Sequence, residues 1–372
     1  KEKEVKFNEK RAEKAKQTAK QVMKGTLKKK RATANEIQSV DALEKADAKM
    51  VDITGDGVPG GECMVTRKMS SQLMNESWFP FGKNGWSSYY GGNERKASLA
   101  AGRRMGAILE HRLQVRNDPV FTKFTRLPQG NLDRRLLANL GMDITNVFNK
   151  SKVDTFKPAM LHLTLDASGS MSGKKWEKVM TVATALAYVG SKVRNIDTVI
   201  SVRGGNETAI VSIVFDSRRD TFPSWMKWAE TLYPNGATPE GLCYKATLGL
   251  ILECTTTHDV YFINFSDGEP SFYVHPSGSR KRRRNYYYNG NTQGCSYAGE
   301  LAYKHTRAQI NTMKEHGVKI LSYFISDYTN YSNDNSSAKA FRQMYGDSAE
   351  FVNVQNAQEV LRTLNKLLLA KD

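Results

Sequence analysis

The stretch LTLDASGSMSGKKW (residues 163–176) joins an apolar run to a short polar segment rich in serine and glycine. The apolar run ends at Asp166, and hydroxyl side chains follow at Ser168 and Ser170. This composition favours a buried strand that opens into a tight loop. The stretch therefore predicts a strand end with several oxygen-bearing side chains close together.

Three later runs share the composition of the strand that precedes this loop. Each is short, rich in β-branched and aromatic residues, and apolar nearly throughout, as a strand covered on both faces must be. Helical patterns separate the runs and are expected near 174–194, 239–253, 298–316, 336–345 and 356–369. The four predicted strands are AMLHLTLD (159–166), AIVSIVFD (209–216), VYFINFSD (260–267) and VKILSYFI (318–325).

This alternation predicts an α/β fold: a doubly wound, mostly parallel sheet flanked by helices, with the four runs as central strands. We expect this domain to span 156–372, with an Arg- and Tyr-rich insertion at about 271–297. Residues 1–50 are expected to form a basic arm that is extended or bound to a partner. Residues 51–155 are expected to form a small, aromatic-rich pre-domain with irregular backbone and helices near 97–116 and 132–140.

Composition excludes several classes of protein. The 372 residues are 40% hydrophobic, enough for a substantial core, yet no run reaches the roughly 18 apolar residues of a membrane span. No apolar signal-peptide region opens the chain, so we expect a cytoplasmic location without membrane contact. The four cysteines form no CxxC pair, and neither a zinc-binding histidine motif nor a phosphate-binding loop occurs.

The net charge of +17 is concentrated in two segments. Residues 1–31 carry a net charge of +9, and residues 280–284 add +5. The remainder of the chain is therefore nearly neutral, which indicates a neutral body with two basic appendages. The second appendage comprises Arg280, Lys281, Arg282, Arg283 and Arg284, and is followed by Tyr286, Tyr287 and Tyr288.

Oxygen-bearing side chains occur at three places beside the predicted strands and helices. Asp166, Ser168 and Ser170 follow the first strand, Thr238 lies in GATPEG, and Asp267 ends the third strand. Ligands of doubly wound sheets bind where the carboxyl ends of strands meet. Oxygen donors without sulfur or imidazole select a hard divalent cation, Mg²⁺ first and Mn²⁺ or Ca²⁺ next.

The order D-x-S-x-S, G-x-T and strand-terminal Asp-Gly resembles the metal-ion-dependent adhesion site (MIDAS) of von Willebrand factor A (vWA) domains. The resemblance implies that Ser168, Ser170 and Thr238 contact the metal through hydroxyls, and that Asp166 and Asp267 act directly or through water. It also implies that an acidic residue of a partner completes the metal's coordination. The serines lack an adjacent histidine base, so nucleophilic catalysis is not expected.

The segment before the domain carries a second resemblance. HRLQVRND (111–118), GNLDRRLLANL (130–140) and the D-x-S-x-S segment together are similar to the C-terminal half of the CobT subunits of aerobic cobaltochelatase. That resemblance implies an adaptor that works with a MoxR-type AAA+ ATPase and is not catalytic by itself.

Two other functions remain open at this point. A basic arm suits a structural component of a larger assembly, for example a phage particle, in which case the protein would be located in a virion. The cations at 280–284 and the three tyrosines that follow also suit nucleic-acid binding, since single-strand binders combine positive charge with stacking rings. The same residues suit contact with an acidic protein surface. A solvated surface loop explains the same residues without a ligand.

Overall fold

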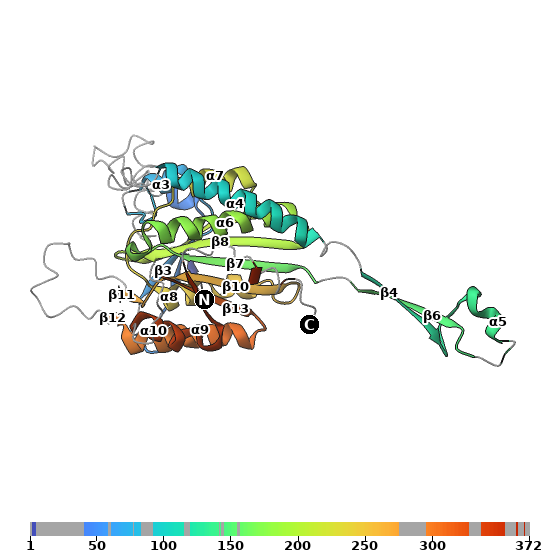
Figure 1. Cartoon of the computed structure of the whole chain (residues 1–372). Coiled ribbons are helices and arrows are strands. Elements are labelled where there is room, and N and C mark those ends of the chain that lie inside the picture. Colours follow the sequence, from blue (N-terminus) through green and yellow to red (C-terminus); the bar gives the residue numbers. More distant parts are fainter. Residues whose placement is uncertain are drawn as a thin grey trace, which may run out of the picture.

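The computed structural model of this 372-residue chain describes most of it. The described residues are 2–4, 41–58, 61–76, 78–82, 92–114, 120–140, 142, 145–154, 157–274, 295–326, 336–353, 362, 363 and 368. Their main feature is a large sheet covered by helices on both faces, from which one slender segment projects (Figure 1). Among the described residues, no helix has the length and apolarity needed to cross a membrane.

Within the described residues, the main sheet has nine strands in the order β1-β2-β3-β9-β8-β7-β10-β13-β14. Its centre is parallel, because each adjacent pair in the run β8-β7-β10-β13-β14 is parallel. The predicted doubly wound, mostly parallel α/β fold is thereby confirmed. The strands are β1 (Glu2–Glu4), β2 (Ala48–Asp52), β3 (Glu62–Thr66), β7 (Ala159–Asp166), β8 (Ile196–Gly205), β9 (Ala209–Asp216), β10 (Asp259–Ser266), β13 (Lys319–Ser326) and β14 (Ala349–Asn353).

One of the four predicted strands runs in the other direction. The run at 209–216 is β9, and it pairs antiparallel with β8, a strand that the sequence analysis did not identify. Only residues 206–208 separate the two strands, and so short a connection closes an antiparallel hairpin, whereas a parallel pair needs a crossover of a dozen residues or more. The expectation that all four runs are parallel central strands was therefore wrong for 209–216.

Helices cover both faces of the sheet (Figure 1). Leu161, Leu163 and Leu165 of β7 point to a core shared with α4, α6 and α7, whereas Met160 belongs to a second core with α8, α9 and α10. Four helices match the prediction closely, namely α6 (Lys174–Lys192), α8 (Glu240–Leu252), α9 (Gly299–Glu315) and α10 (Ser336–Tyr345). The others are α3 (Ser71–Asn75), α4 (Gly92–Leu113), α5 (Leu137–Leu140) and α7 (Phe222–Ala229), and most of the helix expected at 356–369 lies outside the described residues.

Several segments before residue 120 are part of the same body. β2 and β3 extend the main sheet, and β1 pairs with β2. Helix α4 packs closely on α6, since a Cβ added at Gly102 would lie 2.5 Å from the Thr181 carbonyl oxygen. Strands of the main sheet therefore come from all three segments distinguished in the sequence, residues 1–50, 51–155 and 156–372.

Two aromatic side chains of the pre-domain are buried in the body. Phe79 and Phe81 meet edge to face, with ring centroids 5.2 Å apart, and both belong to the core that contains α6. These two rings therefore pack inside the body. Trp86, Tyr89 and Tyr90 lie outside the described residues.

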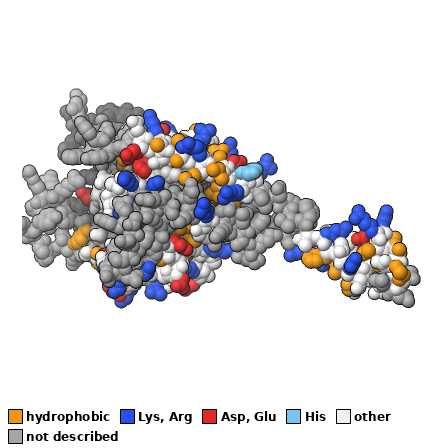
Figure 2. Space-filling view, in the orientation of Figure 1, with side chains coloured by type: hydrophobic (Ala, Val, Ile, Leu, Met, Phe, Trp, Pro, Cys, Tyr) orange, Lys and Arg blue, Asp and Glu red, His pale blue; other side chains and the backbone are white. Residues whose placement is uncertain are grey.

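The projecting segment, which we call the β-arm, comprises residues 120–154. Its described residues form a separate three-stranded sheet with the order β4 (Val120–Leu127), β6 (Phe148–Asp154) and β5 (Asn131–Leu132). Between β5 and β6 the chain forms a 3₁₀ turn (Arg134–Leu136) and the short helix α5. None of its described residues belongs to the hydrophobic cores of the body. Figure 2 shows hydrophobic and basic side chains on its surface, and the exposed large hydrophobic residues are Phe124, Leu132, Leu137, Met142 and Val153.

Candidate metal centre

The loop after β7 is built around the carboxylate of Asp166, the last residue of that strand. Its Oδ1 accepts a hydrogen bond from the backbone N–H of Ser168 at 2.9 Å, and its Oδ2 accepts one from the hydroxyl of Ser266 at 2.9 Å. Ser266 ends the neighbouring strand β10, so this hydrogen bond joins the ends of the two strands. The side chain of Asp166 is completely buried.

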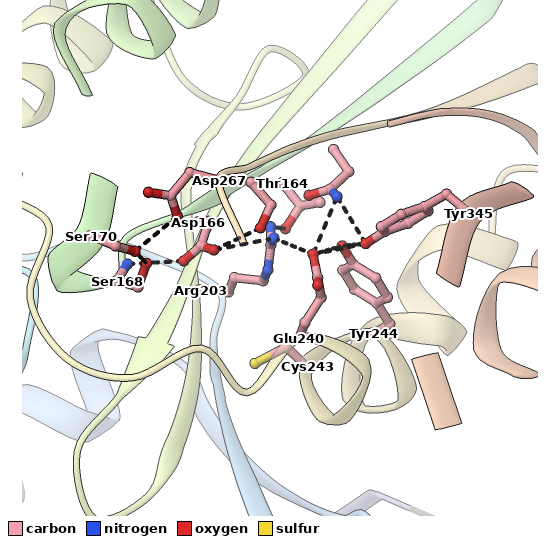
Figure 3. Close-up of polar contacts among 12 residues, drawn as sticks. Thr164, Asp166, Ser168, Ser170, Arg203, Glu240, Cys243, Tyr244, Asp267 and Tyr345 are labelled. Carbon is pink, nitrogen blue, oxygen red and sulfur yellow. Dashed lines mark hydrogen bonds and ion pairs between the residues drawn. The ribbon is translucent and has the colours of Figure 1, made fainter. Parts of the chain in front are cut away.

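Two hydroxyls and a second carboxylate lie beside this loop (Figure 3). The Oγ atoms of Ser168 and Ser170 are 2.9 Å apart, and the Ser170 hydroxyl donates to Oδ1 of Asp267 at 2.8 Å. Asp267 comes close because β10 pairs with β7 in parallel, with Phe265 opposite Leu165. Four of the five side chains predicted as metal ligands are therefore gathered at one sheet edge.

The fifth predicted residue, Thr238, lies on a loop that hydrogen bonds to the first. The N–H of Asn235 donates to the Ala167 carbonyl at 2.7 Å, and the N–H of Gly169 donates to the Gly236 carbonyl at 3.0 Å. Thr238 is buried, and its backbone pairs with Ser271. Within the described part of the chain, no hydrogen bond joins its hydroxyl to the other four side chains.

A buried ion pair lies behind the Asp166 carboxylate. The guanidinium of Arg203 on β8 has Nη2 2.7 Å from Glu240 Oε1 and 3.9 Å from Asp166 Oδ2. Its Nη1 donates to the Thr164 hydroxyl at 3.1 Å. Arg203 and Glu240 have no exposed side-chain surface, so they interact at low dielectric.

Glu240 begins α8 and is held by further donors besides Arg203. Its Oε1 accepts hydrogen bonds from the hydroxyls of Tyr345 at 2.7 Å and Tyr244 at 3.0 Å, and from the Asn264 amide at 3.2 Å. A buried carboxylate with this many donors is strongly fixed in position. The loop after β7 is thereby connected through Arg203 and Glu240 to α8 and α10.

Burial raises the pKa of Asp166 to about 6, because its charged form has lost contact with water. The carboxylates of Glu240 and Asp267 add to this rise, whereas Arg203 and the Ser168 N–H lower the pKa. Together, desolvation and the neighbouring carboxylates raise the pKa of Asp166 by more than Arg203 and the Ser168 N–H lower it. The Asp166 carboxylate therefore lies where additional positive charge would be favourable.

Lys175 provides the second positive charge of the cluster. Its Nζ is 2.6 Å from Asp267 Oδ2 and donates to the Ser170 carbonyl at 3.3 Å. Three carboxylates, of Asp166, Asp267 and Glu240, thus share two cations, Arg203 and Lys175. The formal charge of this five-residue cluster is −1.

The donor chemistry and the charge both fit a divalent cation. The gathered donors are hydroxyl and carboxylate oxygens, which are the ligands that Mg²⁺ prefers. The described residues contain no group of three or more His, Cys, Asp or Glu suited to a metal, so a cation would here depend on the serine hydroxyls as well as the carboxylates. A divalent ion would change the cluster charge from −1 to +1.

Sequence reasoning missed Lys175, Arg203, Glu240 and Ser266. One signal was available for Arg203, since a cation in the otherwise apolar run TVISVRGG requires a buried counter-charge. Nothing local identifies which acid supplies it. The predicted basic and aromatic contacts at 280–284 and 286–288 lie outside the described residues.

No protein-family model and no curated protein sequence matches this chain. Solved structures with a similar fold include the pilus adhesin SpaC from Lactobacillus rhamnosus GG in its open conformation, at 14% identity and a TM-score of 0.42, covering 67% of this chain and 32% of SpaC. The vWF domain of the type V pili tip protein Mfa5 from Porphyromonas gingivalis has 11% identity and a TM-score of 0.43, covering 59% of this chain and 99% of that domain.

A von Willebrand factor type A protein from Catenulispora acidiphila has 13% identity and a TM-score of 0.36, covering 68% of this chain and 51% of that one. The aligned region spans only about a third of SpaC and about half of the Catenulispora protein. At such identities the likeness is one of fold, and the ligands and activities of these proteins are not transferred to this chain.

Proposed function

We propose that this chain is a metal-dependent protein-interaction module that binds an acidic residue of a partner through a divalent cation, Mg²⁺ first and Mn²⁺ or Ca²⁺ next. The observation that carries the proposal is the cluster of oxygen donors whose formal charge is −1. With a divalent cation the cluster has a charge of +1, which one carboxylate of a partner neutralises. The proposed ligands are Asp166, Ser168, Ser170, Thr238 and Asp267, as the vWA resemblance implies.

The residues of the chain orient the donors before any ligand arrives. Ser266 and the Ser168 N–H hold the Asp166 carboxylate, while Arg203 holds it from behind. Ser170 is fixed through its bond to Asp267. When bound, the cation supplies exchangeable coordination positions for a partner's carboxylate. Binding rather than catalysis is favoured, since the serine hydroxyls contact each other and Asp267 instead of a histidine.

For the partner we propose a MoxR-type AAA+ ATPase, the role implied by the resemblance to CobT-like subunits. The test is a pull-down of such an ATPase with wild-type protein and with Ser170→Ala, each with Mg²⁺ and with EDTA. Ser170 is chosen because it is exposed, so its loss leaves the core intact. Retention by wild type with Mg²⁺ alone supports the proposal, whereas equal retention in all four samples contradicts it.

A structural role in an assembly is the second candidate, and the β-arm is the observation that favours it. The β-arm carries most of the exposed large hydrophobic side chains of the described residues but contributes none to the body's cores. Such a surface is typical of a segment buried against other subunits. Stoichiometric presence of the protein in a purified particle would support this role, and its absence from such particles would argue against it.

A further inference from the structure

The two oxygens of the Asp267 carboxylate have different partners, one of which is Lys175. Oδ1 accepts from the Ser170 hydroxyl at 2.8 Å, and Oδ2 contacts the Lys175 ammonium group at 2.6 Å. The Lys175 and Asp267 side chains are only 17% and 3% exposed, so solvent screens their charges weakly. Lys175 therefore forms an ion pair with Asp267, one of the proposed metal ligands, through Oδ2. The other oxygen of Asp267, Oδ1, contacts the Ser170 hydroxyl.

Helix α6 fixes this lysine in place. The helix begins at Lys174, directly after Gly173, and Lys175 is its second residue. Its further bond to the Ser170 carbonyl ties the ammonium group to the serine loop itself. Lys174, the neighbouring lysine, is exposed and makes none of these contacts. Two adjacent lysines thus differ in their contact with the cluster.

The formal charges show what Lys175 does to a bound cation. With Lys175 the cluster changes from −1 to +1 when a divalent ion binds, so the loaded state attracts an anion. Without Lys175 the same change is from −2 to 0, so the ion is attracted more strongly and no positive charge is left over. Removal of one positive charge a few ångströms from a divalent ion tightens its binding about tenfold even at the dielectric constant of water.

We propose that Lys175 makes firm cation binding at this site depend on an anionic carboxylate: it weakens binding of the cation alone and strengthens binding of the carboxylate to the cation-loaded site. This rests on the proposed function, because it assumes that the cluster binds a divalent cation. By linkage, the carboxylate raises the cation's affinity by the same factor as the cation raises that of the carboxylate. The site then holds metal firmly only when an acidic partner is present.

The test is a titration of the full chain with Mn²⁺, in which electron paramagnetic resonance measures the concentration of free Mn²⁺ at each point. Wild type, Lys175→Gln, Lys175→Arg and the matched control Lys174→Gln are compared in sodium chloride and in sodium acetate of equal ionic strength. Acetate is the probe for a partner's carboxylate. The chloride series has the same ionic strength, so a difference between the two salts does not come from screening of charges by salt. Circular dichroism of each variant checks that it folds.

In chloride, Lys175→Gln is expected to bind Mn²⁺ about tenfold more tightly than wild type, whereas Lys174→Gln and Lys175→Arg stay within about twofold. Acetate is expected to tighten Mn²⁺ binding to wild type several-fold and to Lys175→Gln by less than twofold. Both effects together support the proposal, since the control removes the same charge one residue away.

Two outcomes overturn it in distinguishable ways. If Mn²⁺ binds but Lys175→Gln and Lys174→Gln behave alike in both salts, the role of Lys175 is wrong and the metal site stands. If no variant and no wild-type sample binds Mn²⁺ in either salt, the proposed function itself fails, and the role of Lys175 fails with it.

Discussion

The guanidinium of Arg203 lies 2.7 Å from the carboxylate of Glu240, and both side chains are fully buried behind the candidate metal centre. Arg203 also lies 3.9 Å from Asp166, so a single cation balances part of the charge of two buried acids. This relationship makes Arg203 the residue on which the electrostatics of the cluster depend most.

Replacing Arg203 by methionine leaves two buried carboxylates without their shared cation. We expect the free energy of unfolding to fall by about 3–5 kcal/mol, the usual cost of removing one partner of a buried ion pair. Urea denaturation followed by circular dichroism measures the change. Arg194→Met is the control, because Arg194 is exposed, and it is expected to change stability by less than about 0.5 kcal/mol. Similar losses in both variants would contradict this account of Arg203.

Stability is expected to depend on pH through His162. Burial lowers the pKa of His162 to about 4, whereas an unfolded histidine titrates near 6.5. The unfolded state therefore binds more protons between these values, and the free energy of unfolding falls as the pH decreases from about 6.5 towards 4. In His162→Gln this loss between pH 7.5 and 5 is expected to be smaller by about 1–2 kcal/mol.

Urea denaturation at a series of pH values checks the contribution of His162. The variant His316→Gln is the control, since His316 is exposed at the end of α9. His305, whose pKa burial also lowers, and Asp166, whose pKa burial raises, remain in every sample, so the difference between wild type and variant isolates His162. Parallel pH profiles for wild type and His162→Gln would show that His162 does not cause the loss.

Gly236 is expected to tolerate no side chain. Its φ of +113° is unfavourable for other residues, and an added Cβ would lie 2.8 Å from the Gly205 carbonyl oxygen. We expect Gly236→Ala to lower the free energy of unfolding by about 1–3 kcal/mol and to weaken Mn²⁺ binding, because the Gly236 carbonyl holds the Gly169 N–H of the serine loop.

The matched control is Gly249→Ala on the exposed side of α8, where an added Cβ meets no atom within 4 Å. Because alanine favours helix more than glycine does, this variant is expected to gain up to about 1 kcal/mol and to bind Mn²⁺ as wild type does. Thermal unfolding and Mn²⁺ titration measure both effects. Equal stability of the two variants would contradict the close approach at Gly236.

Removal of the β-arm is expected to leave the body intact. If residues 121–153 are replaced by a flexible Gly-Ser linker, the melting temperature and the Mn²⁺ affinity should match those of the full chain, because no described β-arm residue belongs to the body's cores. Calorimetry and Mn²⁺ titration measure the two quantities. A large drop in melting temperature would mean that the β-arm stabilises the body.

Local patterns were sufficient for much of the fold. The apolar strand at 159–166 and the helix that begins at Lys174 are visible in sequence because a buried strand and a packed helix impose their own periodicity. The order of strands and helices then places Asp166 and Asp267 at one sheet edge. The contacts among Asp166, Ser168, Ser170 and Asp267 agree with that placement, while their role as metal ligands stays a prediction.

Sequence alone thus determined the fold class and the loop that carries the candidate site, since both follow from residues near each other in the chain. Tertiary structure decided the direction of β9 and the charge balance of the site. Lys175 meets Asp267 across 92 residues, and Arg203 meets Glu240 across 37. No periodicity encodes such pairs, because which charges meet depends on how strands pair and helices pack, and not on the composition of either segment.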